Sequence, residues 1–376
     1  MKKIKKFFFA MLLVYLTVFQ VFGLKVSASS SDIDIPDSAQ KYAESYYESA
    51  VSAVREYSEN YNVKEGQLDA VKLARPFVVY EIGETTQDEI YYYPILDSTD
   101  NIVLLLSVMG TTDGWKISVS EEWVDGLNKI GTITPEYIFY KSEDNIYAEN
   151  KQEKFCVEGE TDLQLCSFSI KPYEIKRQEI SDFVNRFVKT DVSSENNIDV
   201  KTKDGYTPSF SSSLSDSTVC ALYNKKGQGS YNLCWAASVA TICNYRDGTN
   251  ISAKNVANRV GIDYNAGANI TVAQDALKSY GVNYYNMHAN KDIRMSWSSL
   301  KSNIRDKYPV YASAKSHNSG HAVTAYGYTV AAGVKYVIFW NSGNESSMAV
   351  EFKENGTSFS YAGKTYTWMY SVCKYY

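Results

Sequence analysis

A cysteine at the start of an apolar segment is the residue of this sequence best suited to covalent chemistry. Cys234 follows the polar stretch "GQGSYNL" and opens "CWAASVATIC", a run that predicts a helix. In the first turn of a helix, unpaired backbone N–H groups and the helix dipole stabilise a thiolate. We therefore expect Cys234 to have a lowered pKa and to act as a nucleophile. A disulfide or a buried structural thiol is the alternative.

Three segments of the C-terminal half together resemble the active-site segments of papain-like cysteine peptidases. They read "QGSYNLCWA", "GHAVTAYGY" and "YVIFWNSG", and they hold, in order, Gln228, Cys234, His321 and Asn341. The resemblance covers about residues 215–376. The sequence departs from plant and lysosomal members because it lacks the extra cysteine and the Gly-Ser pair before the nucleophile, and the Trp two residues after the asparagine. Its layout is similar to that of the compact secreted staphopains of bacteria.

The resemblance implies a role for each of these side chains. His321 would take the thiol proton and stand as an imidazolium opposite the thiolate of Cys234. Asn341 would orient the imidazole through its far nitrogen. Gln228 would donate its amide, together with the backbone N–H of the cysteine, to the oxyanion of a tetrahedral intermediate. A thioester acyl-enzyme and its hydrolysis would follow.

Each of these assignments has a simpler structural alternative. His317, in the polar loop "KSHNSGH", and His288 are the other two histidines, and His321 is favoured because the strand-like run "AVTAYGY" follows it. Asn341 could be only a turn residue in "WNSG", and Gln228 only a loop residue. With three histidines and no Cys-x-x-Cys motif, we expect neither a metal site nor a cofactor.

The N-terminal half predicts a helix followed by strands and carries no catalytic constellation. The helix is capped by Asp37 or Ser38 and is expected to run to about Tyr61, because apolar residues recur three or four apart. Together these elements predict a helix packed on an antiparallel sheet. Strands are expected at 77–82, 90–96, 102–108 and 115–119, and a hairpin at 154–168.

The six cysteines do not form a dense disulfide framework. Cys156 and Cys166 flank the predicted hairpin and could pair, and a pairing of Cys220 with Cys373 stays open. Cys243 lies nine residues after the nucleophile on the predicted helix, which puts the two on opposite faces and forbids a bridge between them. Its apolar neighbours favour a buried structural thiol.

The two halves of the chain differ in charge. Residues 29–204 hold 17 Lys/Arg and 34 Asp/Glu, a net charge of −17, whereas residues 205–376 hold 16 and 9, a net charge of +7. Opposite net charges attract each other at low ionic strength. Residues 190–218 are rich in Ser, Thr, Asn and Asp and read as a connector that proteases can cut. A secreted two-domain chain with such a connector is one way to build a zymogen.

The expected organisation has four parts. Lysines, an apolar run and small residues predict a secretory signal peptide at 1–28, with a retained membrane anchor as the alternative. An acidic propeptide domain at 29–200 follows, then a cleavable linker at 201–218 and a papain-like catalytic domain at 219–376. The fold class is α+β, with a helical lobe and an antiparallel β lobe in the catalytic domain and a helix-plus-antiparallel-sheet prodomain before it.

The predicted function is that of a secreted, extracellular cysteine endopeptidase made as a zymogen. Its partners would be a protein or peptide substrate and its own propeptide as inhibitor, with no stable membrane association and a monomeric state. Nucleic acid is not an expected partner, since the C-terminal half has no basic run. The alternatives are another Cys-His acyl-transfer enzyme on this fold, such as a leader peptidase, a transglutaminase-like enzyme or an amidase, or an inactive binding protein.

Overall fold

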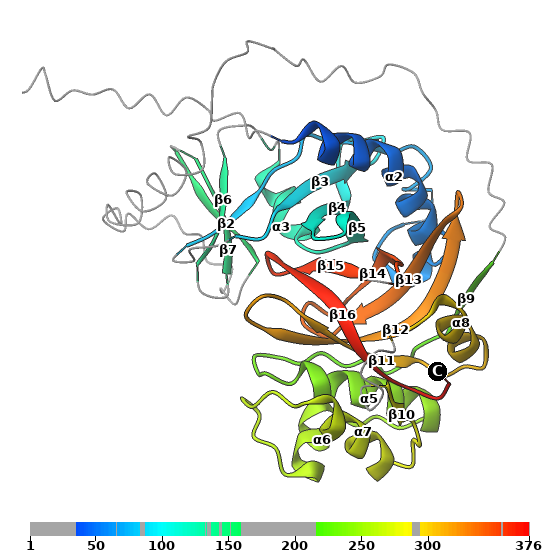
Figure 1. Cartoon of the computed structure of the whole chain (residues 1–376). Coiled ribbons are helices and arrows are strands. Elements are labelled where there is room, and N and C mark those ends of the chain that lie inside the picture. The colour runs from blue at the N-terminus through cyan, green and yellow to red at the C-terminus, as the bar shows by residue number, and fades with distance from the viewer. Residues whose placement is uncertain are drawn as a thin grey trace, which may run out of the picture. The chain divides into compact units, whose positions relative to one another are not determined.

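The computed structural model describes the larger part of both halves of the chain (Figure 1). The predicted signal peptide, the second strand of the predicted hairpin with Cys166, the linker up to residue 215, and His288 lie outside the described residues. Within the described part, no helix is long and apolar enough to cross a membrane. The described residues are 35–64, 66–82, 87–131, 133, 137–142, 145–150, 152–158, 216–287, 294–354 and 356–375.

The first helix is shorter than its pattern predicts. α2 spans Asp37–Arg55 and a 3-10 turn, η1, follows at Ser58–Asn60, so the expected end near Tyr61 was wrong. The helix stops because Tyr57 leaves helical dihedral angles, with φ −129° and ψ 37°, and donates its hydroxyl to the carbonyl of Tyr328 at 3.0 Å. The fully buried residues of α2 are Ala39, Ala43, Ala50, Val51, Ala53 and Val54.

Strands form at all four positions predicted in the N-terminal half, and a second small sheet joins them. β3, β4 and β5 form an antiparallel meander with β1, whereas β2 pairs in parallel with β6 in a sheet of order β2-β6-β7-β8. That parallel pairing was not expected from the sequence. The elements are β1 (Lys72–Leu73), β2 (Val79–Glu81), β3 (Ile90–Leu96), β4 (Ile102–Thr111), β5 (Gly114–Ser120), α3 (Val124–Ile130), β6 (Ile138–Ser142), β7 (Asn145–Glu149) and β8 (Lys154–Glu158).

The C-terminal half places three helices on one side of long antiparallel strands. α5, α6 and α7 share a core with Tyr311 and Ala322 from the sheet, and Trp235 is the largest buried side chain in that core. The elements are β9 (Ser217–Val219), α5 (Cys234–Asp247), α6 (Ala253–Val260), α7 (Ile270–Ser279), β10 (Tyr285–Asn286), α8 (Trp297–Arg305), β11 (Val310–Lys315), β12 (Gly320–Ala331), β13 (Val334–Asn341), β14 (Ser346–Glu351), β15 (Ser358–Tyr361) and β16 (Lys364–Cys373).

One sheet runs through both halves. Among the described residues it has twelve strands, in the order β1-β3-β4-β5-β14-β13-β12-β11-β16-β10, with β15 beside β16 and β9 beside β12. The junction is the antiparallel pair of β5 and β14, in which Val119 lies opposite Ala349. The mixture of helices and antiparallel sheet predicted for the chain is confirmed, but this continuity was not expected.

Side chains of α2 reinforce the junction. Ser49 and Tyr336 share a hydrogen bond of 2.6 Å between their buried hydroxyls, and Tyr42 donates its hydroxyl to Glu351 at 2.7 Å. Tyr336 lies on β13 and Glu351 ends β14, so the helix contacts strands from the far half of the chain (Figure 1). The N-terminal half is therefore bonded to strands of the C-terminal half by both backbone and side chains.

Candidate active site

Cys234 is the first residue of α5, as its position in the sequence predicts. Trp235, Ala236 and Ala237 after it are buried, which fixes the start of the helix, while Cys234 itself is half-buried. Leu233 before it offers no capping side chain, so the first N–H groups of the helix are not taken by a side-chain cap. The backbone thus presents the thiol at a rigid helix terminus.

His321 and Asn341 lie side by side on neighbouring strands. His321 follows the first residue of β12 and Asn341 ends β13, in a register that sets Val323 opposite Asn341. The imidazole Nε2 and Asn341 Oδ1 are 2.7 Å apart, and both residues are buried. Of the four residues expected in the site, these two are thus joined directly by a hydrogen bond.

The same asparagine fixes which nitrogen of the imidazole carries a proton. Asn341 Oδ1 also accepts a hydrogen bond of 2.9 Å from the backbone N–H of Gly343, which orients the amide with its oxygen toward the ring. Because that oxygen can only accept, Nε2 of His321 is the donor of the 2.7 Å bond. In a neutral imidazole, Nδ1 is then the nitrogen with a free lone pair for a thiol proton.

The thiol of Cys234 lies beside the strand that carries the histidine. It interacts with the backbone N–H of Ala322, the residue after His321, as well as with amides at its own helix start. Ala322 also belongs to the buried cluster against which Cys234 packs. Residues 88 positions apart in the chain are therefore neighbours in the fold.

Burial shifts the pKa values of the Cys234 thiol and the His321 imidazole in the directions that favour their neutral forms. It raises the pKa of the Cys234 thiol, and the backbone amides of Ala322, Trp235 and Cys234 offset this only in part. The expected lowering of this pKa is thus not found, because desolvation outweighs the helix terminus. Burial also lowers the pKa of His321 to about 4, against a smaller opposite effect of the hydrogen bond to Asn341. Burial therefore favours the neutral form of each of these two groups.

Gln228 lies in the loop that approaches the turn after Asn341. Its backbone N–H donates to the carbonyl of Ser342 at 2.9 Å, which ties the glutamine loop to the end of β13. Its side-chain oxygen is buried and accepts no hydrogen bond from the described residues. The loop is thus fixed near the asparagine, but among the described residues no hydrogen bond joins the Gln228 side chain to Cys234.

The other histidines are placed differently. His317 is exposed in the turn between β11 and β12, and His288 lies outside the described residues. Among the cysteines, Cys243 is buried, as expected, and Cys220 and Cys373 are free buried thiols rather than a disulfide. The described residues contain no group of three or more His, Cys, Asp or Glu side chains that could hold a metal ion.

Two tyrosines complete the surroundings of the histidine and were missed in the sequence. The ring of Tyr361 stacks on the imidazole of His321 with centroids 4.6 Å apart and an interplanar angle of 21°. Tyr366 contacts the same imidazole at 5.6 Å in a tilted geometry. Among 32 tyrosines in the chain, nothing in the local pattern distinguishes these two, since their contact depends on the pairing of β15 with β16.

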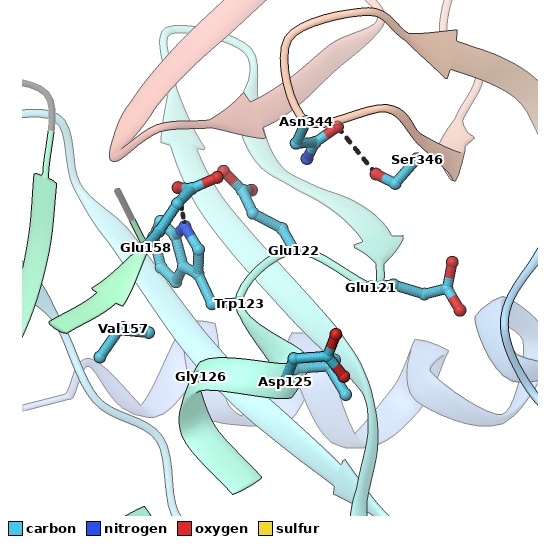
Figure 2. Close-up of a pocket in the computed structure, with 10 residues that line it drawn as sticks. Glu121, Glu122, Trp123, Asp125, Gly126, Val157, Glu158, Asn344 and Ser346 are labelled. Carbon is cyan, nitrogen blue, oxygen red and sulfur yellow. Dashed lines mark hydrogen bonds between the residues drawn. The ribbon is translucent and has the colours of Figure 1, made fainter. Parts of the chain in front are cut away.

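A pocket lies between the N-terminal half and the turn that follows Asn341 (Figure 2). Figure 2 shows the carboxyl groups of Glu122 and Glu158 facing each other, with Asn344 across the pocket. Burial and the proximity of Glu158 raise the pKa of Glu122 well above its usual range. No residue predicted for the active site lines this pocket, which belongs to the junction of the two halves.

Comparison with known proteins gives a match for the C-terminal half. Residues 219–368 match the model of the Peptidase_C39 like family, and this span contains all four residues expected in the site. No curated protein matches the chain.

Solved structures that match include procathepsin L 3 from the larval midgut of Tenebrio molitor. It has 15% identity, covers 41% of this chain and 70% of its own, and has a TM-score of 0.30. A structure from work on antibody cross-reactivity between the mite allergens Blo t 1 and Der p 1 has 17% identity, covers 50% and 77%, and also has a TM-score of 0.30. The family match supports the conclusion that the C-terminal half of this chain is similar to cysteine peptidases.

Proposed function

We propose that this protein is a secreted cysteine endopeptidase made as a zymogen. Its signal peptide would be 1–28, its propeptide 29–200, its linker 201–218 and its catalytic domain 219–376. The observation that carries the proposal is the buried 2.7 Å hydrogen bond between His321 and Asn341 on strands beside the helix-terminal thiol. The match of residues 219–368 to a peptidase family supports the same reaction class.

The proposed reaction begins with transfer of the thiol proton of Cys234 to Nδ1 of His321. The sulfur then attacks the carbonyl carbon of a peptide bond, and the carbonyl π pair moves to oxygen to form an oxyanion. Gln228 and the backbone N–H of the cysteine stabilise that oxyanion. Its collapse expels the amine, which takes the proton from the imidazolium, and leaves a thioester. Water, deprotonated by the imidazole, hydrolyses the thioester and restores the thiol.

Asn341 serves this cycle through the imidazole. Because the amide oxygen of Asn341 accepts a hydrogen bond from Nε2, Nδ1 remains available to exchange a proton with the thiol. The imidazolium formed during attack also retains Asn341 as a hydrogen-bond partner. The bond from Gly343 holds the amide in the orientation that this requires. Asn341 therefore orients the base and transfers no proton itself.

The contacts between the halves support a latent form. Ala362 lies in the turn between β15 and β16. Its backbone N–H donates to the carboxylate of Glu122 at 2.7 Å, and its carbonyl accepts a hydrogen bond of 3.1 Å from the ammonium of Lys141. The ammonium of Lys364, the first residue of β16, lies 3.3 Å from a carboxylate oxygen of Glu81. These bonds, with the β5–β14 pair, hold the N-terminal half against the catalytic strands while thiol and imidazole are neutral.

Alkylation of the thiols tests the nucleophile. In chain cleaved within the linker and freed of its N-terminal half, iodoacetamide at about pH 6 should modify Cys234 much faster than the other thiols. Burial raises the pKa of Cys220, Cys243 and Cys373 to about 12, so these three serve as internal controls. Equal labelling of all four would contradict the proposal.

Peptide hydrolysis tests the reaction. The freed form should cleave a peptide library and the Cys234→Ala variant should not, whereas the intact chain should be nearly inactive. Addition of an amine acceptor separates hydrolysis from acyl transfer, because a transferase would give the amide product in place of the acid. An intact chain as active as the freed form would refute the zymogen.

A further inference from the structure

We propose that Tyr361 is a positioning residue: its ring holds the imidazole of His321 against Asn341, and the N-terminal half holds Tyr361 in place through the turn that follows it. This inference rests on the proposed role of His321 as the base. It assigns the control of that base to a residue outside the expected set of four.

The contact between the two rings is close and enclosed. Tyr361 stacks on His321 with a centroid distance of 4.6 Å, while Tyr366 closes a second side of the imidazole. The hydroxyl of Tyr361 fills the space beside Gly343, where any side chain would collide with it. Since Gly343 also donates to Asn341, the tyrosine abuts the whole histidine–asparagine pair.

The backbone next to Tyr361 is bonded to the N-terminal half. Tyr361 is the last residue of β15, and the next residue, Ala362, is bonded through its N–H to Glu122 and through its carbonyl to Lys141. Thr365 on the other side of the turn donates its backbone N–H to Asp88 at 2.7 Å. All three partners belong to the N-terminal half.

This arrangement couples the two halves to the protonation of the base. While the turn is held, Tyr361 excludes water from the imidazole, and a desolvated imidazole resists protonation. Once the turn is released, the ring of Tyr361 is free to leave and His321 can take the proton that the thiol must give up. The charged and titratable groups around the two phenols are the thiol of Cys234, which lies near both, Lys364 near Tyr366, and the carboxyl groups of Glu122 and Glu158 near Tyr361.

Titration of the imidazole in the full chain tests the proposal without any need for activity. In a Cys234→Ala background with labelled histidine, NMR follows three imidazoles, and His321→Gln identifies the relevant one. Tyr361→Ala should raise the pKa of His321 by about one unit or more from its lowered value. Tyr361→Phe should leave it unchanged, because the stacked ring remains, and Lys141→Met should raise it by a smaller amount.

Two controls keep the result interpretable. Tyr285→Ala removes a tyrosine that is 53% exposed and should have no effect on the His321 titration. Tyr361→Leu keeps an apolar side chain at this position, and the pKa of His321 is measured in this variant if the alanine variant does not fold. A pKa of His321 that stays the same in both the alanine and the leucine variants would overturn the proposal.

Alkylation of the full chain with its native thiol gives a second readout. In Tyr361→Ala, iodoacetamide at about pH 6 should label Cys234 several-fold faster than in the parent, because a protonated imidazole stabilises the thiolate. Labelling of Cys243 should stay slow, and an equal rise there would mean unfolding and count against the proposal. If the titration shifts but no form of the protein hydrolyses peptides, the proposed function fails while the role of Tyr361 stands.

Discussion

Replacement of Asn341 by alanine probes the histidine–asparagine pair most directly. The change leaves two donors without an acceptor. They are the buried Nε2–H of His321, now bonded to Asn341 at 2.7 Å, and the part-buried backbone N–H of Gly343, now bonded to Asn341 at 2.9 Å. A buried donor without a partner costs about 1–3 kcal/mol, and the partly exposed amide belongs at the lower end of that range. We therefore expect the free energy of unfolding to fall by about 2–4 kcal/mol.

Urea unfolding of the full chain measures this loss, with Cys234→Ala as the parent so that no self-cleavage interferes. The matched control is Asn344→Ala in the same turn, which removes only a 2.8 Å bond from Ser346 and should cost less than Asn341→Ala. In the active chain, Asn341→Ala should lower kcat more than it changes KM, since it misorients the base. Equal stability of the two asparagine variants, with kcat unchanged, would refute this account of the pair.

The remaining predictions concern the base, the oxyanion and the junction. His321→Ala should abolish hydrolysis and His317→Ala should not, as measured by kcat/KM; the reverse outcome would show that the base is misassigned. Gln228→Ala should cost about 3 kcal/mol of activation free energy if it donates to the oxyanion, and an unchanged kcat/KM would exclude that role. Burial raises the pKa of Glu121 to about 7 despite the opposing effects of the hydrogen bond from the backbone N–H of Asn62 and of the charge of Lys225. Because the pKa of this carboxyl is higher in the folded than in the unfolded chain, protonation stabilises the fold at low pH. This contribution to the free energy of unfolding is lost as the pH rises toward 7. Glu121→Gln should therefore flatten the dependence of urea unfolding on pH between about 4 and 7, and an unchanged slope would contradict this.

Local patterning predicted most of the elements and the position of Cys234 at a helix start. The start of α5 at Cys234 follows from a polar loop before an apolar run, and the strand at Ile90–Leu96 follows from a run of β-forming residues. The pairing of His321 with Asn341 was expected only from the resemblance of their two segments to those of papain-like cysteine peptidases.

The features that were missed depend on contacts between distant segments. The β5–β14 pair joins residues more than 200 positions apart, and no local signal distinguishes strands that will pair from strands that remain separate. The thiol of Cys234 has a raised pKa because neighbouring elements bury it, and this effect exceeds that of the helix terminus visible in the sequence. The stacking of Tyr361 on His321 likewise follows from tertiary packing alone.

The β5–β14 pair has a consequence for the C-terminal half on its own. In the intact chain, β14 is bonded on one side to β13 and on the other to β5. Loss of the N-terminal half would turn β14 into an edge strand with unsatisfied N–H and C=O groups along Met348–Val350, next to apolar side chains that α2 no longer covers. An exposed edge of that kind can pair with strands of other molecules, so the freed C-terminal half would tend to self-associate at high concentration. The N-terminal half would then prevent copies of the C-terminal half from pairing with one another through this edge.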